Sequence, residues 1–127
     1  MRVLLDTHVF LWALTDSPKL SVAQKDVLES ESNEVYLSVI SIWELLIKVK
    51  SGKLALPEPV VAYLTKQIKE NHITLLTIRV AHLAKLESLP LRHRDPFDRM
   101  LAAQSLAENM PLLSVDPRMP EYGVEVI

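Results

Sequence analysis

The 127-residue sequence contains no cysteine and only two glycines, Gly52 and Gly123. Without cysteine the chain can form neither a disulfide nor a thiolate zinc site, and it has no cysteine nucleophile. Two isolated glycines cannot supply the loops of a GxGxxG or Walker motif. These common redox, metal and nucleotide sites are therefore excluded. A reducing, cytoplasmic setting fits the lack of cysteine, and we expect one for this protein.

Long hydrophobic runs and a strong net charge are also missing. The longest apolar run, residues 9–14, is far shorter than the roughly 20 residues that a membrane helix needs. Asp6 follows the first apolar residues too soon for a signal peptide, so we expect neither a leader nor membrane association. The net charge is −2 at pH 7. A nucleic-acid partner must therefore be inferred from a local site rather than from an overall basic field.

The sequence does contain enough apolar material for a hydrophobic core. Hydrophobic residues make up 49% of the chain and charged residues 24%, which argues against intrinsic disorder. A chain of this length is typical of one domain, so we expect residues 1–127 to form a single domain.

Short apolar segments alternate with segments of helical periodicity along the chain. The apolar segments predict strands at residues 3–5, 34–38, 73–76, 112–114 and, fifth, 124–126. Helices are predicted at residues 7–14, 20–30, 41–52, 57–70, 80–86 and 97–109. This alternation indicates an α/β fold in which helices cover both faces of a parallel sheet. Ligands of such sheets bind beyond the carboxyl ends of the strands.

Four acidic residues from distant parts of the chain are predicted to meet at that edge. Asp6 follows the first strand, and Asp116 lies just past the fourth. Glu44 and Asp98 each lie in the first turn of a predicted helix beside a strand. Like charges at close range raise one another's pKa, and a divalent cation removes that conflict. Oxygen ligands, with no cysteine and no zinc-type histidine spacing, favour Mg²⁺ or Mn²⁺.

Each acid also has a purely structural interpretation. Ser41 and Glu44 fit a capping box, in which the Ser41 side chain accepts from the Glu44 N–H and the Glu44 side chain accepts from the Ser41 N–H. Asp95 would cap the next helix, and Asp98 would favour its positive end. Asp6 could cap the helix after the first strand, and Asp116-Pro117 could begin a turn. Capping does not explain why four acids should converge on one crevice, so we favour the metal site.

Four motifs together resemble those of PIN-domain proteins, and more narrowly those of VapC-type toxins from bacterial and archaeal toxin–antitoxin pairs. They are Leu4-Leu5-Asp6-Thr7-His8, Ser41-Ile42-Trp43-Glu44, His93-Arg94-Asp95-Pro96-Phe97-Asp98-Arg99 and Ser114-Val115-Asp116. They occur in the family's order and span nearly the whole chain. The resemblance implies a single PIN-like nuclease domain, a three-layer α/β/α fold with a five-stranded parallel sheet.

The resemblance also implies an Mg²⁺- or Mn²⁺-dependent endoribonuclease, the toxin of a type II toxin–antitoxin pair. Water rather than the ribose 2′-OH would attack the phosphodiester, leaving 5′-phosphate and 3′-hydroxyl ends. Thr7, Asp95 and Ser114 match accessory polar positions; the family often has threonine where this chain has Ser114, and the hydroxyl is retained. The family's catalytic and metal-binding quartet carries over onto Asp6, Glu44, Asp98 and Asp116.

Basic residues near the acids are candidates for binding the RNA substrate. Arg92 and Arg94 precede the helix that carries Asp98, and Arg99 follows that acid directly. Phosphate contacts from such residues would position RNA without reading its sequence. An ordinary solvent-exposed role is the alternative for any one of them.

The helix predicted at residues 41–52 is apolar on most sides. Such a helix is either deeply buried or part of an interface. We expect Trp12 and Trp43 in the core, with an interface as the alternative. The resemblance favours the interface, because it implies a homodimer and a cognate antitoxin protein.

Other functions stay open at this point. A phosphatase of the haloacid-dehalogenase type would use Asp6 as its nucleophile, but its pattern requires a second aspartate at the position of His8. We expect His8 to pack or to lie at the surface near the site. A noncatalytic RNA-binding PIN module and a non-toxin RNA-processing nuclease are the further alternatives.

Overall fold

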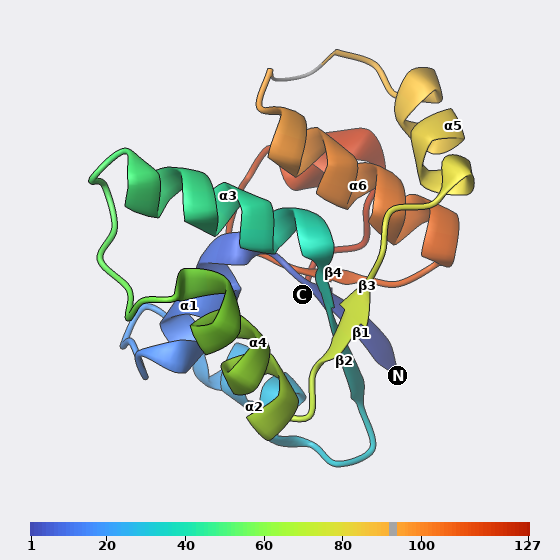
Figure 1. The fold of residues 1–127 in the computed structure, drawn as a ribbon. Coiled ribbons are helices and arrows are strands. Elements are labelled where there is room, and N and C mark those ends of the chain that lie inside the picture. Colours follow the sequence, from blue (N-terminus) through green and yellow to red (C-terminus); the bar gives the residue numbers. More distant parts are fainter. Residues whose placement is uncertain (92–93) are drawn as a thin grey trace.

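The computed structural model describes residues 1–91 and 94–127. Single strands alternate with pairs of helices along most of the chain (Figure 1). The strands are β1 (Arg2–Leu5), β2 (Glu34–Ser38), β3 (Thr74–Leu76) and β4 (Leu112–Leu113). The helices are α1 (Thr7–Leu14), α2 (Val22–Glu29), α3 (Val39–Lys50), α4 (Val60–Glu70), α5 (Val80–Ser88), α6 (Pro96–Glu108) and the 3-10 helix η1 (Met119–Tyr122).

The strands of the described residues form one parallel sheet in the order β3-β2-β1-β4. The sequence predicts a fifth strand at residues 124–126, and the structure corrects this prediction. The segment makes only an isolated bridge, between Val126 and Leu112. The Leu112 N–H donates to the Glu125 carbonyl at 2.8 Å, and the Ile127 N–H donates to the Leu112 carbonyl at 3.0 Å. The segment therefore follows β4 in parallel, but it reaches β4 only over its last residues and forms no regular ladder.

Helices cover both faces of the sheet, as expected for three layers (Figure 1). Side chains of successive strand residues point to opposite faces. Val3 and Leu5 accordingly pack in one apolar cluster with residues of α1 and α4, whereas Leu4 packs in a second cluster with residues of α6 and η1. Both clusters consist of buried residues, and so the sheet lies in the centre of the core. No helix of the described residues is long and apolar enough to cross a membrane.

Helix α3 begins earlier than the sequence predicts. Its N-cap is Ser38, whose hydroxyl accepts a hydrogen bond from the Ile40 N–H at 3.2 Å. The predicted capping box of Ser41 and Glu44 is therefore wrong, and Glu44 lies in the second turn. Ser41 is buried instead, and its hydroxyl lies 2.8 Å from that of Thr7 on α1. This bond between two side chains 34 positions apart fixes α3 against α1.

The exposed side of α3 corrects a second expectation. Trp43 was predicted to lie in the core, but 58% of its surface is exposed. Val39 and Ile47 are also exposed, while Ile42 and Leu45 on the other side of the helix are buried. Trp12 is half-buried. Helix α3 is thus apolar on a buried and on an exposed face, which is why its sequence lacks a clear polar stripe.

Candidate functional site

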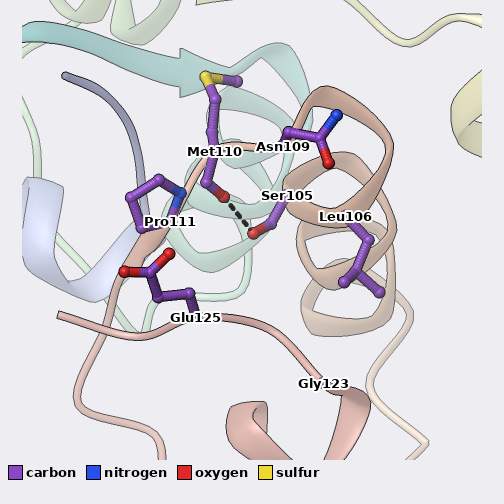
Figure 2. Close-up of a pocket in the computed structure, with 7 residues that line it drawn as sticks. All are labelled: Ser105, Leu106, Asn109, Met110, Pro111, Gly123 and Glu125. Atoms are coloured by element: carbon purple, nitrogen blue, oxygen red, sulfur yellow. Dashed lines mark hydrogen bonds between the residues drawn. The ribbon is translucent and has the colours of Figure 1, made fainter.

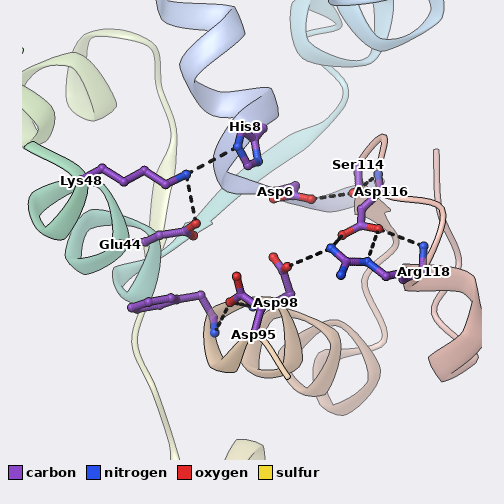
Figure 3. Close-up of polar contacts among 10 residues, drawn as sticks. Asp6, His8, Glu44, Lys48, Asp95, Asp98, Ser114, Asp116 and Arg118 are labelled. Atoms are coloured by element: carbon purple, nitrogen blue, oxygen red, sulfur yellow. Dashed lines mark hydrogen bonds and ion pairs between the residues drawn. The ribbon is translucent and has the colours of Figure 1, made fainter. Parts of the chain in front are cut away.

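A cavity of about 500 Å³ lies where the carboxyl ends of β1 and β4 meet the helices. Asp6 directly follows β1, and Asp116 follows β4 by three residues. All four predicted catalytic acids line this cavity, as does Asp95. Figure 3 shows these carboxylates converging from α3, α6 and the ends of the strands. The other lining residues are His8, Trp12, Lys48, Val115, Pro117 and Arg118.

Asp6 is held at the cavity by the sheet and by a serine from the other end of the chain. Its N–H donates to the Leu113 carbonyl at 3.0 Å, so that the backbone continues the pairing of β1 with β4. Asp6 occupies the N-cap position of α1, but its side chain makes no capping hydrogen bond. The Ser114 hydroxyl donates instead to Asp6 Oδ2 at 2.5 Å. The carboxylate is buried, and its orientation therefore follows from Ser114 rather than from helix capping.

Ser114 links two members of the quartet. While its hydroxyl donates to Asp6, it accepts a hydrogen bond from the Asp116 N–H at 3.1 Å. Both bonds need an oxygen that can donate and accept at once, which a hydroxyl supplies. The accessory position predicted for Ser114 thus coincides with a bridge between Asp6 and Asp116.

Glu44 projects from α3 and is buried at the cavity wall. One turn further along, Lys48 Nζ lies 3.4 Å from Glu44 Oε2. The same ammonium lies 3.5 Å from His8 Nε2 on α1. A cation therefore stands between an acidic and an imidazole side chain at this side of the cavity (Figure 3).

Asp98 and Asp95 come from the start of α6. Asp95 is the N-cap, as predicted, and its Oδ1 accepts from the N–H groups of Phe97 and Asp98 at 2.9 and 3.2 Å. Burial raises the pKa of the Asp98 carboxyl to about 7, and repulsion from the other four acids adds to the shift. The four contributing carboxylates are those of Asp95, Asp6, Glu44 and Asp116, in that order. These acids are therefore close enough to interact electrostatically.

Asp116 is engaged by an arginine that the sequence reasoning missed. Arg118 Nη2 lies 2.9 Å from Asp116 Oδ2, and Arg118 Nε donates to Asp116 Oδ1 at 3.1 Å. The same Nη2 lies 3.9 Å from Asp98 Oδ2. The only sequence signal for this arrangement is the two-residue spacing in Asp116-Pro117-Arg118, which suits a turn.

The donor set suits a hard divalent cation, because the converging side chains offer carboxylate oxygens. Asp6 Oδ1 and Glu44 Oε1 are buried oxygens without a hydrogen-bond partner, and such atoms are costly unless something pairs with them. Over residues 1–91 and 94–127, however, no group of three or more acidic or histidine side chains is arranged to hold an ion as it stands. Metal ligation by the quartet therefore stays a prediction.

The remaining predicted site residues that the structure describes do not line the cavity. Thr7 is buried beside Asp6 and bonds Ser41, which ties two site helices together. Arg99 Nη1 donates to the Pro90 carbonyl at 2.9 Å, and its guanidinium lies over the Tyr122 ring. Arg94 is exposed. Arg92 lies outside the described residues. The structure thus ties Arg99 to a neighbouring loop and to η1.

A second, smaller cavity of about 210 Å³ contains none of the predicted site residues (Figure 2). It lies where α6 ends and the chain turns toward β4. The Ser105 hydroxyl donates to the Met110 carbonyl at 2.5 Å, so that this hydroxyl is already satisfied. Its one charged lining residue is Glu125. The acidic cavity therefore carries the stronger case for chemistry.

Comparison with known proteins agrees with this fold and with the motifs. The chain is 30% identical over 121 residues to Ribonuclease VapC22 of Mycobacterium tuberculosis, which covers 94% of this chain and 91% of that protein. Among solved structures, VapBC2 from Rickettsia felis, bound to a DNA fragment from their promoter, has a TM-score of 0.76 at 16% identity and covers 100% of this chain and 98% of the matched chain. VapBC-1 from nontypeable Haemophilus influenzae has a TM-score of 0.72 at 17% identity, with coverages of 100% and 97%.

The family model that matches is described as the PIN domain, and it spans residues 3–125. This match extends over nearly the whole chain and includes all five acids of the cavity. The match favours a PIN-domain role for Asp6 over the role of nucleophile in a phosphatase. The chain belongs to the PIN-domain family.

Proposed function

We propose that this protein is an Mg²⁺- or Mn²⁺-dependent endoribonuclease and the toxin of a type II toxin–antitoxin pair. One observation carries the proposal: carboxylates from four separate chain segments line one cavity, and two of their buried oxygens have no protein partner. Similarity to Ribonuclease VapC22 supports RNA as the substrate. Hydrolysis of a phosphodiester fits this charge arrangement, because a divalent cation could neutralise both the acids and a phosphate.

The catalytic and metal-binding roles fall to the quartet. Asp6, Glu44 and Asp98 would hold the cation directly or through water, and Asp116 would complete the site. A bound cation lowers the pKa of water and stabilises negative charge on the phosphate. Ser114 keeps one oxygen of Asp6 occupied and leaves Oδ1 available. Asp95 caps α6 and thereby fixes the start of the helix that carries Asp98.

RNA would approach an acidic cavity that has cations at its wall. Lys48 lines the cavity beside Glu44, which suits a phosphate contact near the scissile bond. Arg94 is exposed one residue before Asp95 and could contact phosphates further along the strand. Arg92 and Arg99 stay candidates for such contacts. Because phosphate contacts carry no base information, we expect these residues to affect affinity more than sequence preference.

We also infer two protein partners, a second copy of this chain and an antitoxin. The exposed apolar side of α3, with Trp43 and Ile47, adjoins a cavity of about 460 Å³. Exposed apolar patches of this kind mark interaction surfaces. Similarity of fold to VapBC2 and VapBC-1 supports an antitoxin partner. For such a pair we expect a cytoplasmic location.

Cleavage of RNA by the purified chain tests the enzymatic proposal. Mixed single-stranded and structured RNAs are incubated with Mg²⁺, Mn²⁺ or EDTA, using wild type, Asp6→Asn and the control Asp26→Asn. Asp26 is an exposed acid on α2, so the control makes the same chemical change outside the cavity. We expect cutting with either metal by wild type and by the control, with 5′-phosphate product ends, and a loss of at least about a hundredfold in Asp6→Asn.

Two outcomes would contradict this proposal. Cutting that persists in EDTA and in the Asp6→Asn variant would reject the metal mechanism. RNA binding without cleavage at saturating Mn²⁺, for every RNA offered, would favour a noncatalytic RNA-binding PIN module instead.

A further inference from the structure

Arg118 is the cation that contacts the candidate acidic site most extensively. Its guanidinium reaches both carboxylate oxygens of Asp116, and it lies 3.9 Å from Asp98 Oδ2. Two members of the predicted quartet therefore share one arginine (Figure 3). A divalent cation that used the same oxygens could bind only after the guanidinium had moved aside.

The backbone around Arg118 would stay in place during such a movement. The Arg118 N–H donates to Asp116 Oδ1 at 2.9 Å, and the Met119 N–H donates to the Asp116 carbonyl at 3.2 Å. Met119 is fully buried and begins η1, which anchors the turn in the core. The Arg118 side chain is 51% exposed. Release of the guanidinium thus requires only a side-chain rotation toward solvent.

We propose that Arg118 is a competing counterion of the acidic site: its guanidinium occupies Asp116 and Asp98 until a divalent cation binds, and then contacts a phosphate of the RNA strand. This inference rests on the proposed function and adds a regulatory step to it. The carboxylates stay paired with a cation throughout, because the metal replaces the arginine as their partner, and the dication adds one positive charge to the site. The freed guanidinium suits a phosphate, with which it can form paired hydrogen bonds.

The expected effects have opposite signs for metal and for RNA. Removing the arginine removes a competitor for the carboxylates and a positive charge that repels the metal, so metal affinity should rise. An exposed ion pair contributes little, and we expect an increase of about two- to fivefold. Loss of one phosphate contact should weaken RNA binding and reduce the slope of log affinity against log salt by about 0.7 for a single strand. A purely structural role for Arg118 would not strengthen metal binding.

The test measures Mn²⁺ binding and RNA binding separately. Mn²⁺ affinity is obtained by isothermal titration calorimetry without RNA, so this arm does not depend on cleavage. RNA affinity is obtained from fluorescence anisotropy of a labelled single-stranded RNA at several salt concentrations in Ca²⁺, which prefers the same oxygen ligands. The variants are Arg118→Gln, Arg118→Lys and the control Arg79→Gln. Arg79 is 58% exposed and pairs with Glu108 outside the cavity, which matches Arg118 closely.

We expect Arg118→Gln to bind Mn²⁺ more tightly and RNA more weakly, whereas the Arg79→Gln control should resemble wild type in both assays. Arg118→Lys should retain the RNA salt slope, because it keeps the charge, yet lose part of the competition with Mn²⁺. Unchanged or weaker Mn²⁺ binding in Arg118→Gln would overturn the proposal while leaving the proposed function intact. An unchanged RNA salt slope would overturn the phosphate contact. Absence of Mn²⁺ binding in wild type and in Arg118→Gln alike would overturn the proposed function as well.

Discussion

Replacing Asp98 by asparagine should stabilise the metal-free protein at neutral pH. Burial and four neighbouring acids raise the pKa of this carboxyl to about 7 from its ordinary 3.8. Between these values the unfolded chain loses the proton while the folded chain keeps it, so the stability of the fold declines as the pH rises from about 4 to 7. Above pH 7 the destabilisation is complete, and asparagine, which carries no charge, avoids it.

The size of the effect follows from the same shift. A pKa difference of about 3 corresponds to about 4 kcal/mol. The side chain is 14% exposed and lines an open cavity, so solvent screening reduces this to about 2 kcal/mol. Asparagine also removes a negative charge from the first turn of α6, which costs about 0.5 kcal/mol. The net gain of about 1.5 kcal/mol should raise the Tm by about 4–8 °C for a domain of this size.

Thermal unfolding followed by circular dichroism in EDTA measures this effect. The Tm of wild type, Asp98→Asn and the control Glu87→Gln is compared at pH 5, 6, 7 and 8. Glu87 is an exposed acid on α5 and does not line the cavity. We expect the difference between Asp98→Asn and wild type to grow with pH and to level off above 7, with no comparable trend in the control. A Tm difference that is negative at pH 8, or independent of pH, would refute the reasoning.

Substitutions at three further positions test other parts of the site and the surface. Ser114→Ala removes the hydroxyl that bridges Asp6 and Asp116. It should lower the free energy of unfolding by about 1 kcal/mol in denaturant titrations and also reduce RNA cleavage. Ser114→Thr keeps a hydroxyl and should retain the stability and the cleavage activity. Glu44→Gln keeps the shape of a buried side chain that we propose as a metal ligand, but it removes the charge. We expect the Mn²⁺ affinity measured by calorimetry to fall at least about tenfold, with the fold intact by circular dichroism. Trp43→Ser should change the monomer stability by less than about 1 kcal/mol, since the side chain is largely exposed, but should shift sedimentation toward monomer if α3 forms the homodimer interface.

Much of the fold could be predicted because local signals were strong and agreed with one another. The sequence predicts the bounds of α1 and of β2 as the structure has them, and Asp95-Pro96 marks the start of α6. In each case an apolar pattern meets a residue type with a clear boundary preference. The end of the chain had no such support. Residues 124–126 have a high strand propensity, but their pairing with β4 depends on where η1 and Gly123 place them relative to that strand.

The features that sequence could not predict are those determined by tertiary contacts. Ser38 and Ser41 are equally good caps by residue type, and the burial of Ser41 against Thr7 decides between them. A helix with two apolar faces does not reveal which face is buried, and so Trp43 was misplaced. Arg118 belongs to the site only because the turn that follows β4 brings it to Asp116. By contrast, the convergence of the acids could be predicted, since it follows from parallel strands sharing one edge.

The distribution of charge connects the stability of the chain to its proposed chemistry. Five carboxylates and two cations line the acidic cavity, an excess of three negative charges when all are ionised. The whole chain has a net charge of only −2, so the remainder is slightly positive. The metal-free cavity itself would therefore repel an RNA strand. The raised pKa of Asp98 is one response of the metal-free protein to this crowding, and the pairing of Arg118 with Asp116 is another. Under the proposed function both responses would weaken once a divalent cation supplied positive charge, so the metal would bind first and the phosphate second.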